Sequence, residues 1–172
     1  MSKMEETSGD TAFLHLSKMF AAIIFFHISE YLLAVCIHGR QNVNLSSLLI
    51  SKHYILAMVF SVFEYIVEIV LLPDLKEHFW ISNAGLALVI VGETIRKLAI
   101  ITAGASFTHL IRVRRHEQHR LILHGVYRFV RHPGYCGFFI WAVGMQIMLC
   151  NPVSSVAFAV IVWVFFCKKN SL

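Results

Sequence analysis

The chain alternates long apolar runs with short polar segments. Three runs are long enough to cross a membrane, since a helical span needs about 20 mostly apolar residues. Two shorter runs follow and meet at Asn151-Pro152, a dipeptide that favours a turn. The pattern predicts an all-α polytopic membrane protein with about five transmembrane helices, the last two of which form a tight helical hairpin. The runs cover approximately residues 11–37, 50–72, 79–103, 134–150 and 153–167.

The composition favours the same class of protein. Of the 172 residues, 58% are hydrophobic and 15% are charged, and the mean hydropathy is +0.69. These values lie outside the range of a soluble domain of this size. The N-terminus carries Glu5, Glu6 and Asp10 and lacks the basic start of a secretory signal peptide, so we expect the first run to be a retained span. The four scattered cysteines indicate neither a disulfide framework nor a zinc cluster.

Positive charge is concentrated in the connector at residues 104–132. It holds six of the fifteen Lys and Arg residues against one acid, Glu117. The positive-inside rule places this connector on the cytoplasmic side. Counting spans outward places the 38–49 loop and the C-terminal tail on the same side and the N-terminus opposite. The glycosylation sequon at Asn44 is then expected to stay unmodified, because glycosylation takes place in the lumen.

The end of this connector is the strongest candidate for a functional site. Pro133 is favoured at the first position of a helix, so His132 is predicted at or near the N-cap of the next span. The positive end of a helix dipole attracts carboxylates and other anions. Gly134 and Gly137 would let a ligand or another helix approach closely. The alternative is a capped helix start with an interfacial tyrosine, Tyr135.

The rest of the connector allows two simpler interpretations. The cluster Arg112–Arg115 is also typical of a basic collar that fixes topology and contacts anionic lipid. His116 and His119 are three residues apart and in principle could share a metal ion. Without a third ligand at suitable spacing, no metal site is expected.

Two pairs of ionisable residues, one in each of the first two apolar runs, are candidates for buried polar groups. A charge in the middle of a membrane costs about 2.5 to 3.5 kcal/mol on insertion scales, so these side chains are expected to point inward and to be paired or protonated. They are His27, Glu30, Glu64 and Glu68. They fit either a proton path or interhelical hydrogen bonds that hold the helices together.

A third polar group lies near the cytoplasmic end of the third run. Glu93 precedes Arg96 by three residues and Lys97 by four. On a helix these spacings place the side chains on one face, which predicts a local ion pair within the same helix.

Several motifs, in this order and spacing, resemble the isoprenylcysteine carboxyl methyltransferase family. The resemblance covers nearly the whole chain. The Arg-His-Pro-x-Tyr element alone is less specific, because phospholipid methyltransferases and some membrane sterol reductases share it. The matching stretches are Phe26–Tyr31, Gly92–Lys97, Thr102–Gly104 with His109, Gly125–Tyr127, Arg131–Tyr135 and Gln146–Pro152.

The resemblance implies a multi-pass enzyme of the endoplasmic reticulum membrane whose site faces the cytoplasm. Such an enzyme transfers a methyl group from S-adenosylmethionine to the C-terminal carboxylate of a prenylated cysteine, as on small GTPases. One domain covering residues 1–172 is expected, with residues 104–135 as the cofactor-binding connector. Membrane lipid is a further expected partner, nucleic acid is not, and self-association into a homo-oligomer stays open.

The family's site residues carry over position by position. Arg131 is implied as a partner for the carboxylate of either the substrate or the cofactor, since a guanidinium grips a carboxylate with two hydrogen bonds. Arg112 occupies a cofactor contact that is usually a glutamine. The implied cofactor contacts are Arg112, His119, Arg120, Leu121, Ile122, Tyr127, His132, Pro133, Gly134 and Tyr135.

The C-terminal residues depart from the family pattern. Lys169 lies about where the family has an arginine that holds the substrate carboxylate, and the glutamate pair that closes over the cofactor does not follow. Three alternatives to an active methyltransferase remain at this point. One is an impaired relative, shortened at both ends, that binds prenylated tails or pairs with a full-length enzyme. The second is an enzyme similar to a membrane sterol reductase, suggested by the shared Arg-His-Pro-x-Tyr element. The third is a transporter, which rests only on Glu30, Glu64 and Glu68.

Overall fold

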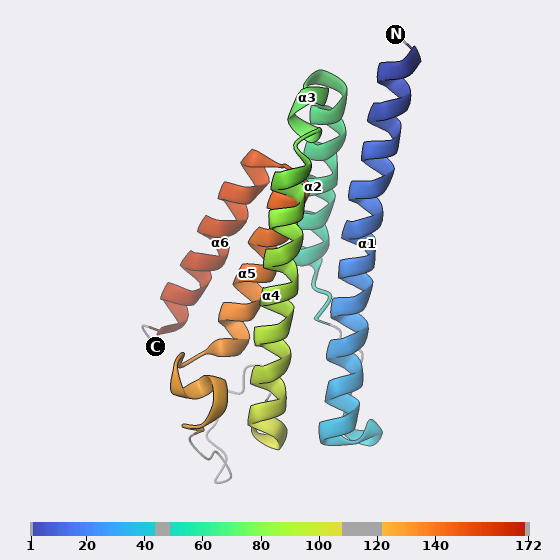
Figure 1. Ribbon diagram of the computed structural model, residues 1–172. Coiled ribbons are helices and arrows are strands. Elements are labelled where there is room, and N and C mark those ends of the chain that lie inside the picture. Colours follow the sequence, from blue (N-terminus) through green and yellow to red (C-terminus); the bar gives the residue numbers. More distant parts are fainter. Residues whose placement is uncertain (1, 44–48, 108–121, 171–172) are drawn as a thin grey trace.

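The computed structural model describes residues 2–43, 49–107 and 122–170, with side chains from residue 9 to residue 164 within these ranges. Every regular element in these ranges is helical, which confirms the predicted all-α class (Figure 1). The long helices are α1 (Ser2–His38), α2 (Lys52–Leu71), α4 (Phe79–Ala103), α5 (Pro133–Met148) and α6 (Pro152–Asn170). Short helical segments are η1 (Arg40–Asn42), α3 (Pro73–Lys76), η3 (Gly104–Ser106) and η4 (Gly125–Arg128).

Two of the described helices are long and apolar enough to cross a membrane by themselves. They are the Gly9–His38 part of α1 and the whole of α2. The α6 segment Pro152–Val164 is apolar but shorter than a span. The five long helices match the five predicted apolar runs, and the count of five transmembrane spans stays a prediction.

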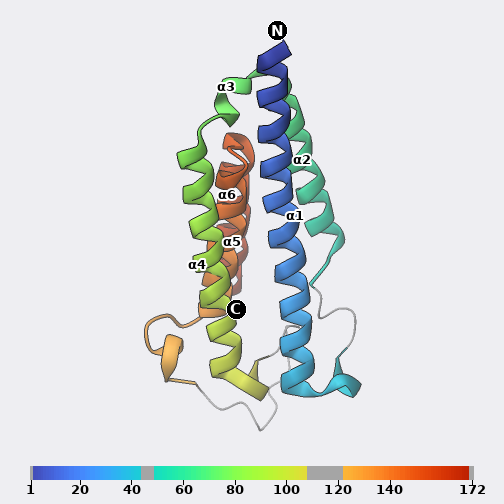
Figure 2. The same ribbon diagram turned by 45° about the vertical axis from the view of Figure 1, so that its right-hand side comes forward.

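The centre of the molecule is the close pair formed by α4 and α5, which run side by side in both views (Figures 1 and 2). Glycines make this approach feasible. A Cβ atom on Gly92 would lie 2.4 Å from the Trp141 backbone nitrogen, and one on Gly137 would lie 2.6 Å from the Gly92 carbonyl oxygen. Gly85 and Gly144 meet the facing backbone in the same way at the other end. The two backbones therefore pack where side chains would otherwise separate them.

Aromatic packing joins α1 to this central pair. Phe26 and Trp141 are almost completely buried, and their rings stack with centroids 4.4 Å apart. The Phe138 ring lies 5.9 Å from the same Phe26 ring. Large aromatic side chains bury much apolar area and add a specific ring geometry. Phe26 thus fixes α1 against the first half of α5.

The predicted hairpin between the last two helices is confirmed. The α5 helix ends at Met148, Cys150 adopts a left-handed φ of 54°, and Pro152 begins α6. Asn151 is fully enclosed, and its side-chain amide donates to the Ser61 carbonyl oxygen of α2 at 2.9 Å. The turn is therefore anchored to α2 as well as being short.

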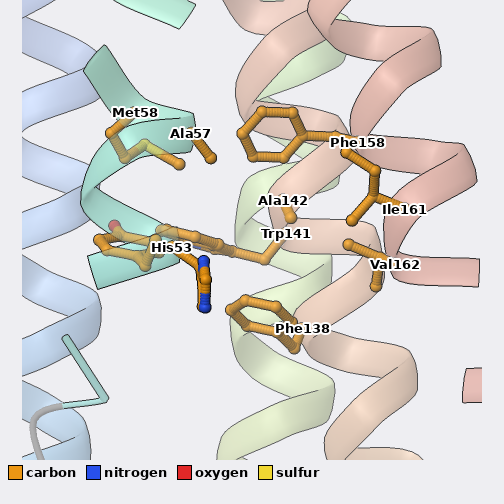
Figure 3. A pocket seen from close by; sticks show the side chains of 10 residues that line it. His53, Ala57, Met58, Phe138, Trp141, Ala142, Phe158, Ile161 and Val162 are labelled. Carbon is orange, nitrogen blue, oxygen red and sulfur yellow. The ribbon is translucent and has the colours of Figure 1, made fainter. Parts of the chain in front are cut away.

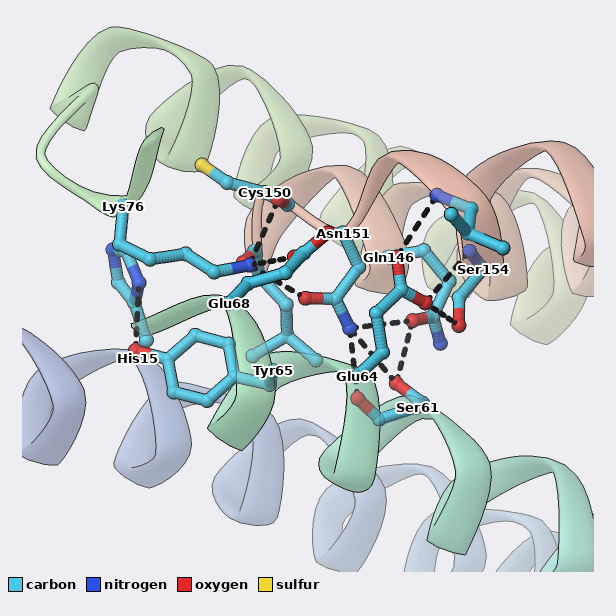
Figure 4. A network of polar contacts seen from close by, with 12 residues as sticks. His15, Ser61, Glu64, Tyr65, Glu68, Lys76, Gln146, Cys150, Asn151 and Ser154 are labelled. Carbon is cyan, nitrogen blue, oxygen red and sulfur yellow. Dashed lines mark hydrogen bonds and ion pairs between the residues drawn. The ribbon is translucent and has the colours of Figure 1, made fainter. Parts of the chain in front are cut away.

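A buried polar network surrounds this turn (Figure 4). The Lys76 ammonium is enclosed and donates to Glu68 Oε2 at 2.6 Å and to the carbonyl oxygens of Leu149 and Cys150 at 3.0 and 2.9 Å. These carbonyls follow the end of α5, where backbone acceptors lack helical partners. Nothing in the apolar pattern singled out Lys76, because it lies in the short helix α3 between two runs.

Glu64 serves the other helix of the hairpin. Its carboxylate accepts from the backbone nitrogens of Val153 and Ser154 at 2.8 Å and from the Ser154 hydroxyl. A carboxylate at a helix N-terminus satisfies free N–H groups and complements the helix dipole. The prediction that Glu64 and Glu68 point inward and are paired is confirmed. Of the two interpretations left open for them, these contacts support interhelical bonding.

Candidate active site

The candidate site lies at the end of the molecule opposite to the N-terminus. The C-terminal ends of α1 and α4, the segment η4 and the start of α5 gather there (Figure 2). Of the residues predicted from the sequence, Ile122, Tyr127, Arg131, His132, Pro133, Gly134 and Tyr135 are described. Arg112, His119, Arg120 and Leu121 lie outside the described residues, as does the side chain of Lys169. The sequon at Asn44 also lies outside them.

The start of α5 has the predicted form. His132 is the N-cap residue and Pro133 occupies the first turn of the helix. Tyr135 and Cys136 donate their backbone N–H groups to the His132 carbonyl oxygen, both at 3.1 Å. Arg131 and His132 are exposed, whereas Pro133 and Gly134 are buried. A helix start with two exposed basic side chains is suited to an anionic group.

The space beside Gly134 is occupied by protein. A Cβ atom there would lie 3.2 Å from the Phe107 ring and 3.9 Å from Ala99 Cβ. His38 at the end of α1 donates from Nε2 to the Phe107 carbonyl oxygen at 3.0 Å, which ties Phe107 to a third helix. Of the two predicted uses of Gly134 and Gly137, close approach of neighbouring protein is therefore the one observed. The sequence contained no signal for the cover by Phe107.

The η4 segment brings Tyr127 beside the end of α4. Gly125 has a φ of +58° and lies against Thr102, where a Cβ atom would come within 2.9 Å of the threonine side chain. Both features favour glycine at this position. Tyr127 is half-buried, and this burial raises the pKa of its phenol, while the Arg96 guanidinium acts in the opposite direction.

Arg96 of α4 is a buried cation whose charge acts on Tyr127 of this segment. Its guanidinium donates from Nε and Nη2 to the two oxygens of Glu30 at 2.8 and 2.9 Å and from Nη1 to the Gly134 carbonyl oxygen at 2.9 Å. Lys97 donates to Glu30 at 2.6 Å and lies 3.1 Å from Glu93. The predicted local ion pair is thus confirmed for Lys97. It is wrong for Arg96, which turns toward the fully buried Glu30 of α1 because that carboxylate needs a partner inside the bundle.

An apolar pocket opens one turn further along α5 (Figure 3). It has a volume of about 190 Å³ and lies between α2, α5 and α6. Phe138 and Trp141 of α5 face Met58 of α2 and Phe158 of α6 across it. The pocket therefore shares Phe138 with the group of aromatic rings around Arg96, whose guanidinium carbon lies 5.7 Å from the Phe138 ring centre. A basic helix start and an apolar pocket adjoin on one helix.

Comparison with known proteins assigns this chain to a class of membrane methyltransferases. Residues 85–170, which include α5 and α6, match the family model for the isoprenylcysteine carboxyl methyltransferase (ICMT) family. The chain belongs to this family.

Individual relatives agree with the family model. The chain is 63% identical over 166 residues to protein-S-isoprenylcysteine O-methyltransferase A of Arabidopsis thaliana, covering 96% of this chain and 84% of that protein. It is 37% identical over 160 residues to the human protein-S-isoprenylcysteine O-methyltransferase, covering 92% of this chain and 56% of that one. These matches leave the reductase and transport alternatives without support.

A solved structure shows the same fold. The structure of the eukaryotic intramembrane Ras methyltransferase ICMT superposes with a TM-score of 0.88 at 36% identity. The match covers 92% of this chain and 57% of that one. The chain therefore spans somewhat more than half the length of this enzyme and of its human relative, and most of the length of the plant protein.

Proposed function

We propose that this protein methylates the C-terminal carboxylate of prenylated cysteine with S-adenosylmethionine as the methyl donor. The observation that carries the proposal is the junction on α5. There, the basic helix start at Arg131 and His132 adjoins an apolar pocket that begins at Phe138. The substrate of such a reaction has the same two parts, a carboxylate and a hydrocarbon chain.

The described residues fit the methyl donor. S-adenosylmethionine carries a carboxylate and an aromatic adenine, and the site offers a helix N-terminus with exposed His132 together with the rings of Tyr127 and Tyr135. A helix start and a basic side chain suit the carboxylate, and aromatic side chains suit the adenine face. The resemblance adds Ile122 and, outside the described residues, Arg112, His119, Arg120 and Leu121 as further contacts.

The substrate is proposed to occupy the adjoining region. Arg131 is assigned to a carboxylate of substrate or donor, because an exposed guanidinium at this helix start can form two parallel hydrogen bonds with it. Lys169 is proposed to assist at the substrate carboxylate. The prenyl chain is assigned to the pocket lined by Phe138, Trp141 and Phe158, whose surface is almost entirely hydrocarbon.

The chemistry asks for alignment and for exclusion of water. When bound, S-adenosylmethionine supplies a methyl group on a positively charged sulfur. Transfer of that methyl group to a carboxylate oxygen would break the carbon–sulfur bond and leave a methyl ester and a neutral thioether, and no proton would need to move. Holding the two reactants in line can lower the barrier by about 7 to 11 kcal/mol. The burial of Pro133 and Gly134 and the apolar wall at Phe138 keep that part of the site dry.

The setting in the cell is part of the proposal. The apolar helices support a membrane protein. The site is proposed to face the cytoplasm at the endoplasmic reticulum membrane, with residues 104–135 as the cofactor-binding connector of a single domain. This arrangement would admit the water-soluble donor from one side and the prenyl chain from the lipid. Contact with membrane lipid and self-association stay predictions.

The decisive experiment measures methyl transfer directly. Membranes containing the chain are incubated with labelled S-adenosylmethionine and a farnesylated cysteine analogue, and the base-labile methyl ester is counted. The same analogue with its carboxylate amidated is the control. Ester formed from the free acid alone supports the proposal. Ester at the level of empty membranes contradicts it, and retained donor binding would then favour the impaired relative.

A further inference from the structure

A buried side chain of α4, Arg96, donates a hydrogen bond to the first turn of α5. Arg96 Nη1 donates to the Gly134 carbonyl oxygen at 2.9 Å, and Arg96 itself is only 6% exposed. A Cβ atom on Gly137, one turn later, would lie 2.7 Å from the Arg96 backbone nitrogen. The Arg96 guanidinium also faces the Phe138 ring. Arg96 therefore lies against α5 at Gly134, Gly137 and Phe138, whereas the preceding Arg131 and His132 are exposed.

Arg96 is itself fixed in orientation. Both oxygens of the fully buried Glu30 accept from it, and the Phe26 ring lies 5.3 Å from its guanidinium carbon. A planar guanidinium with two bonds to one carboxylate has each of its remaining N–H groups held in a fixed direction. In Arg96, an N–H group on Nη1 is directed at the Gly134 carbonyl oxygen. The ion pair between Glu30 of α1 and Arg96 of α4 thus fixes the position of the Gly134 carbonyl oxygen at the start of α5.

We propose that Arg96 is a positioning residue that holds the first turn of α5, and with it the donor-binding segment His132–Tyr135, in its binding geometry. The proposal rests on the proposed function, since it assigns that segment to the methyl donor. Arg96 does not contact the reacting atoms in this role. It acts through its hydrogen bond to the Gly134 carbonyl oxygen.

Lys97 is a matched control within the same cluster. It also donates to Glu30 and also faces the Phe26 ring, at 5.0 Å. The contacts that join Arg96 to Gly134 and Phe138 come from the guanidinium, and the Lys97 ammonium instead bridges to Glu93. Removing Lys97 weakens the ion cluster while leaving the hold on the helix start in place. A purely structural role for Arg96 would make the two substitutions equivalent.

The test compares Arg96→Lys with Lys97→Met in the full chain in detergent micelles. Arg96→Lys keeps the charge, but one ammonium cannot bond both Glu30 oxygens and the Gly134 carbonyl in the same geometry. We expect S-adenosylmethionine affinity by calorimetry to fall by about tenfold, the scale of one charge-assisted hydrogen bond. Without ligand, backbone amide exchange should rise in peptides covering residues 130–138. Lys97→Met should lower the thermal midpoint similarly, keep affinity within about twofold, and leave that exchange unchanged.

Equal affinities or equal exchange in the two variants would overturn the proposal. If Arg96→Lys does not fold, Glu30→Gln replaces it. That variant weakens the anchor of Arg96, and faster exchange at 130–138 than in Lys97→Met is again required. If the wild-type chain neither binds the donor nor forms ester, the proposed function fails. The exchange measurement still decides whether Arg96 holds the helix start.

Discussion

A buried ion pair supports the backbone at each end of α5, but the surroundings of the two ends differ. At each, a carboxylate on another helix holds a buried cation, and the cation donates to backbone carbonyls: Glu68 with Lys76 at the turn, and Glu30 with Arg96 at the start. At the turn the neighbouring α6 amides are also capped, by Glu64. At the start, Arg131 and His132 remain exposed. At the turn after α5, the closed end, buried side chains of the same chain bind the free backbone groups. At the start of α5, the open end, Arg96 binds the Gly134 carbonyl oxygen while Arg131 and His132 stay exposed.

This difference separates stability from binding. A buried ion pair is a weak source of net stability, but removing one partner is costly because an uncompensated charge stays behind. At the closed end, removing one partner should lower only the free energy of unfolding. At the open end, it should lower both the free energy of unfolding and the affinity for ligand. Substitutions along α5 can test this division.

The largest effect is expected midway between the two ends, from Gly92→Val. Its side chain would meet the Trp141 backbone nitrogen, whose distance from a Cβ atom at this position is 2.4 Å. The clash involves backbone on both sides, so α4 and α5 must separate and both ends lose their support. We expect no monodisperse protein by size-exclusion chromatography in detergent. Gly9→Ala is the control, because a Cβ atom at Gly9 meets nothing within 4 Å.

At the closed end, Lys76→Met should lower the free energy of unfolding by about 3 to 5 kcal/mol, the usual cost of removing one partner of a buried pair. The Glu68 side chain is only 12% exposed and would lose its cation. Unfolding in mixed micelles measures the loss, with the exposed Lys52→Met as the control. The KM values for donor and prenylcysteine, measured on the folded fraction, should not change. A raised KM would show that the turn communicates with the site.

At the open end, Arg131→Ala should leave stability unchanged and weaken binding of the carboxylate-bearing ligand by about tenfold, as expected for one charge-assisted contact. Arg131 is exposed. Whether the KM of the donor or that of the prenylcysteine rises identifies the carboxylate that it holds. Arg128→Ala, also exposed but within η4, is the comparison. Equal KM values for both substrates before and after the Arg131 change would remove it from the site.

The smallest effect is expected from Gly134→Ala. The added Cβ atom would lie 3.2 Å from the edge of the Phe107 ring, which a slight tilt can relieve. Alanine also favours a helix over glycine by up to about 1 kcal/mol, so the net change in unfolding free energy should stay within about 1 kcal/mol. Thermal unfolding checks this expectation. A large loss of donor affinity would mean that the ring position itself shapes the site.

The elements of this fold follow from local features of the sequence. Apolar runs of sufficient length predicted the long helices. Pro133, which lacks an N–H group, marked the start of α5, and Asn151-Pro152 marked the turn. These signals act within a few residues of the chain. The motifs from Phe26 to Pro152 also indicated the family, which the comparisons confirm.

The partners of the buried charges were decided by tertiary structure. Local spacing assigned Arg96 to Glu93, whereas the folded chain pairs it with Glu30, 66 positions away, and with Gly134. No sequence pattern marked Lys76 as important, yet its ammonium donates to the carbonyl oxygens of Leu149 and Cys150 after the end of α5. The sequence thus determined where helices form, because spacing and missing donors act locally. The close α4–α5 contact that the glycines permit decided which helix faces pack together. That packing in turn decided which buried charges form pairs.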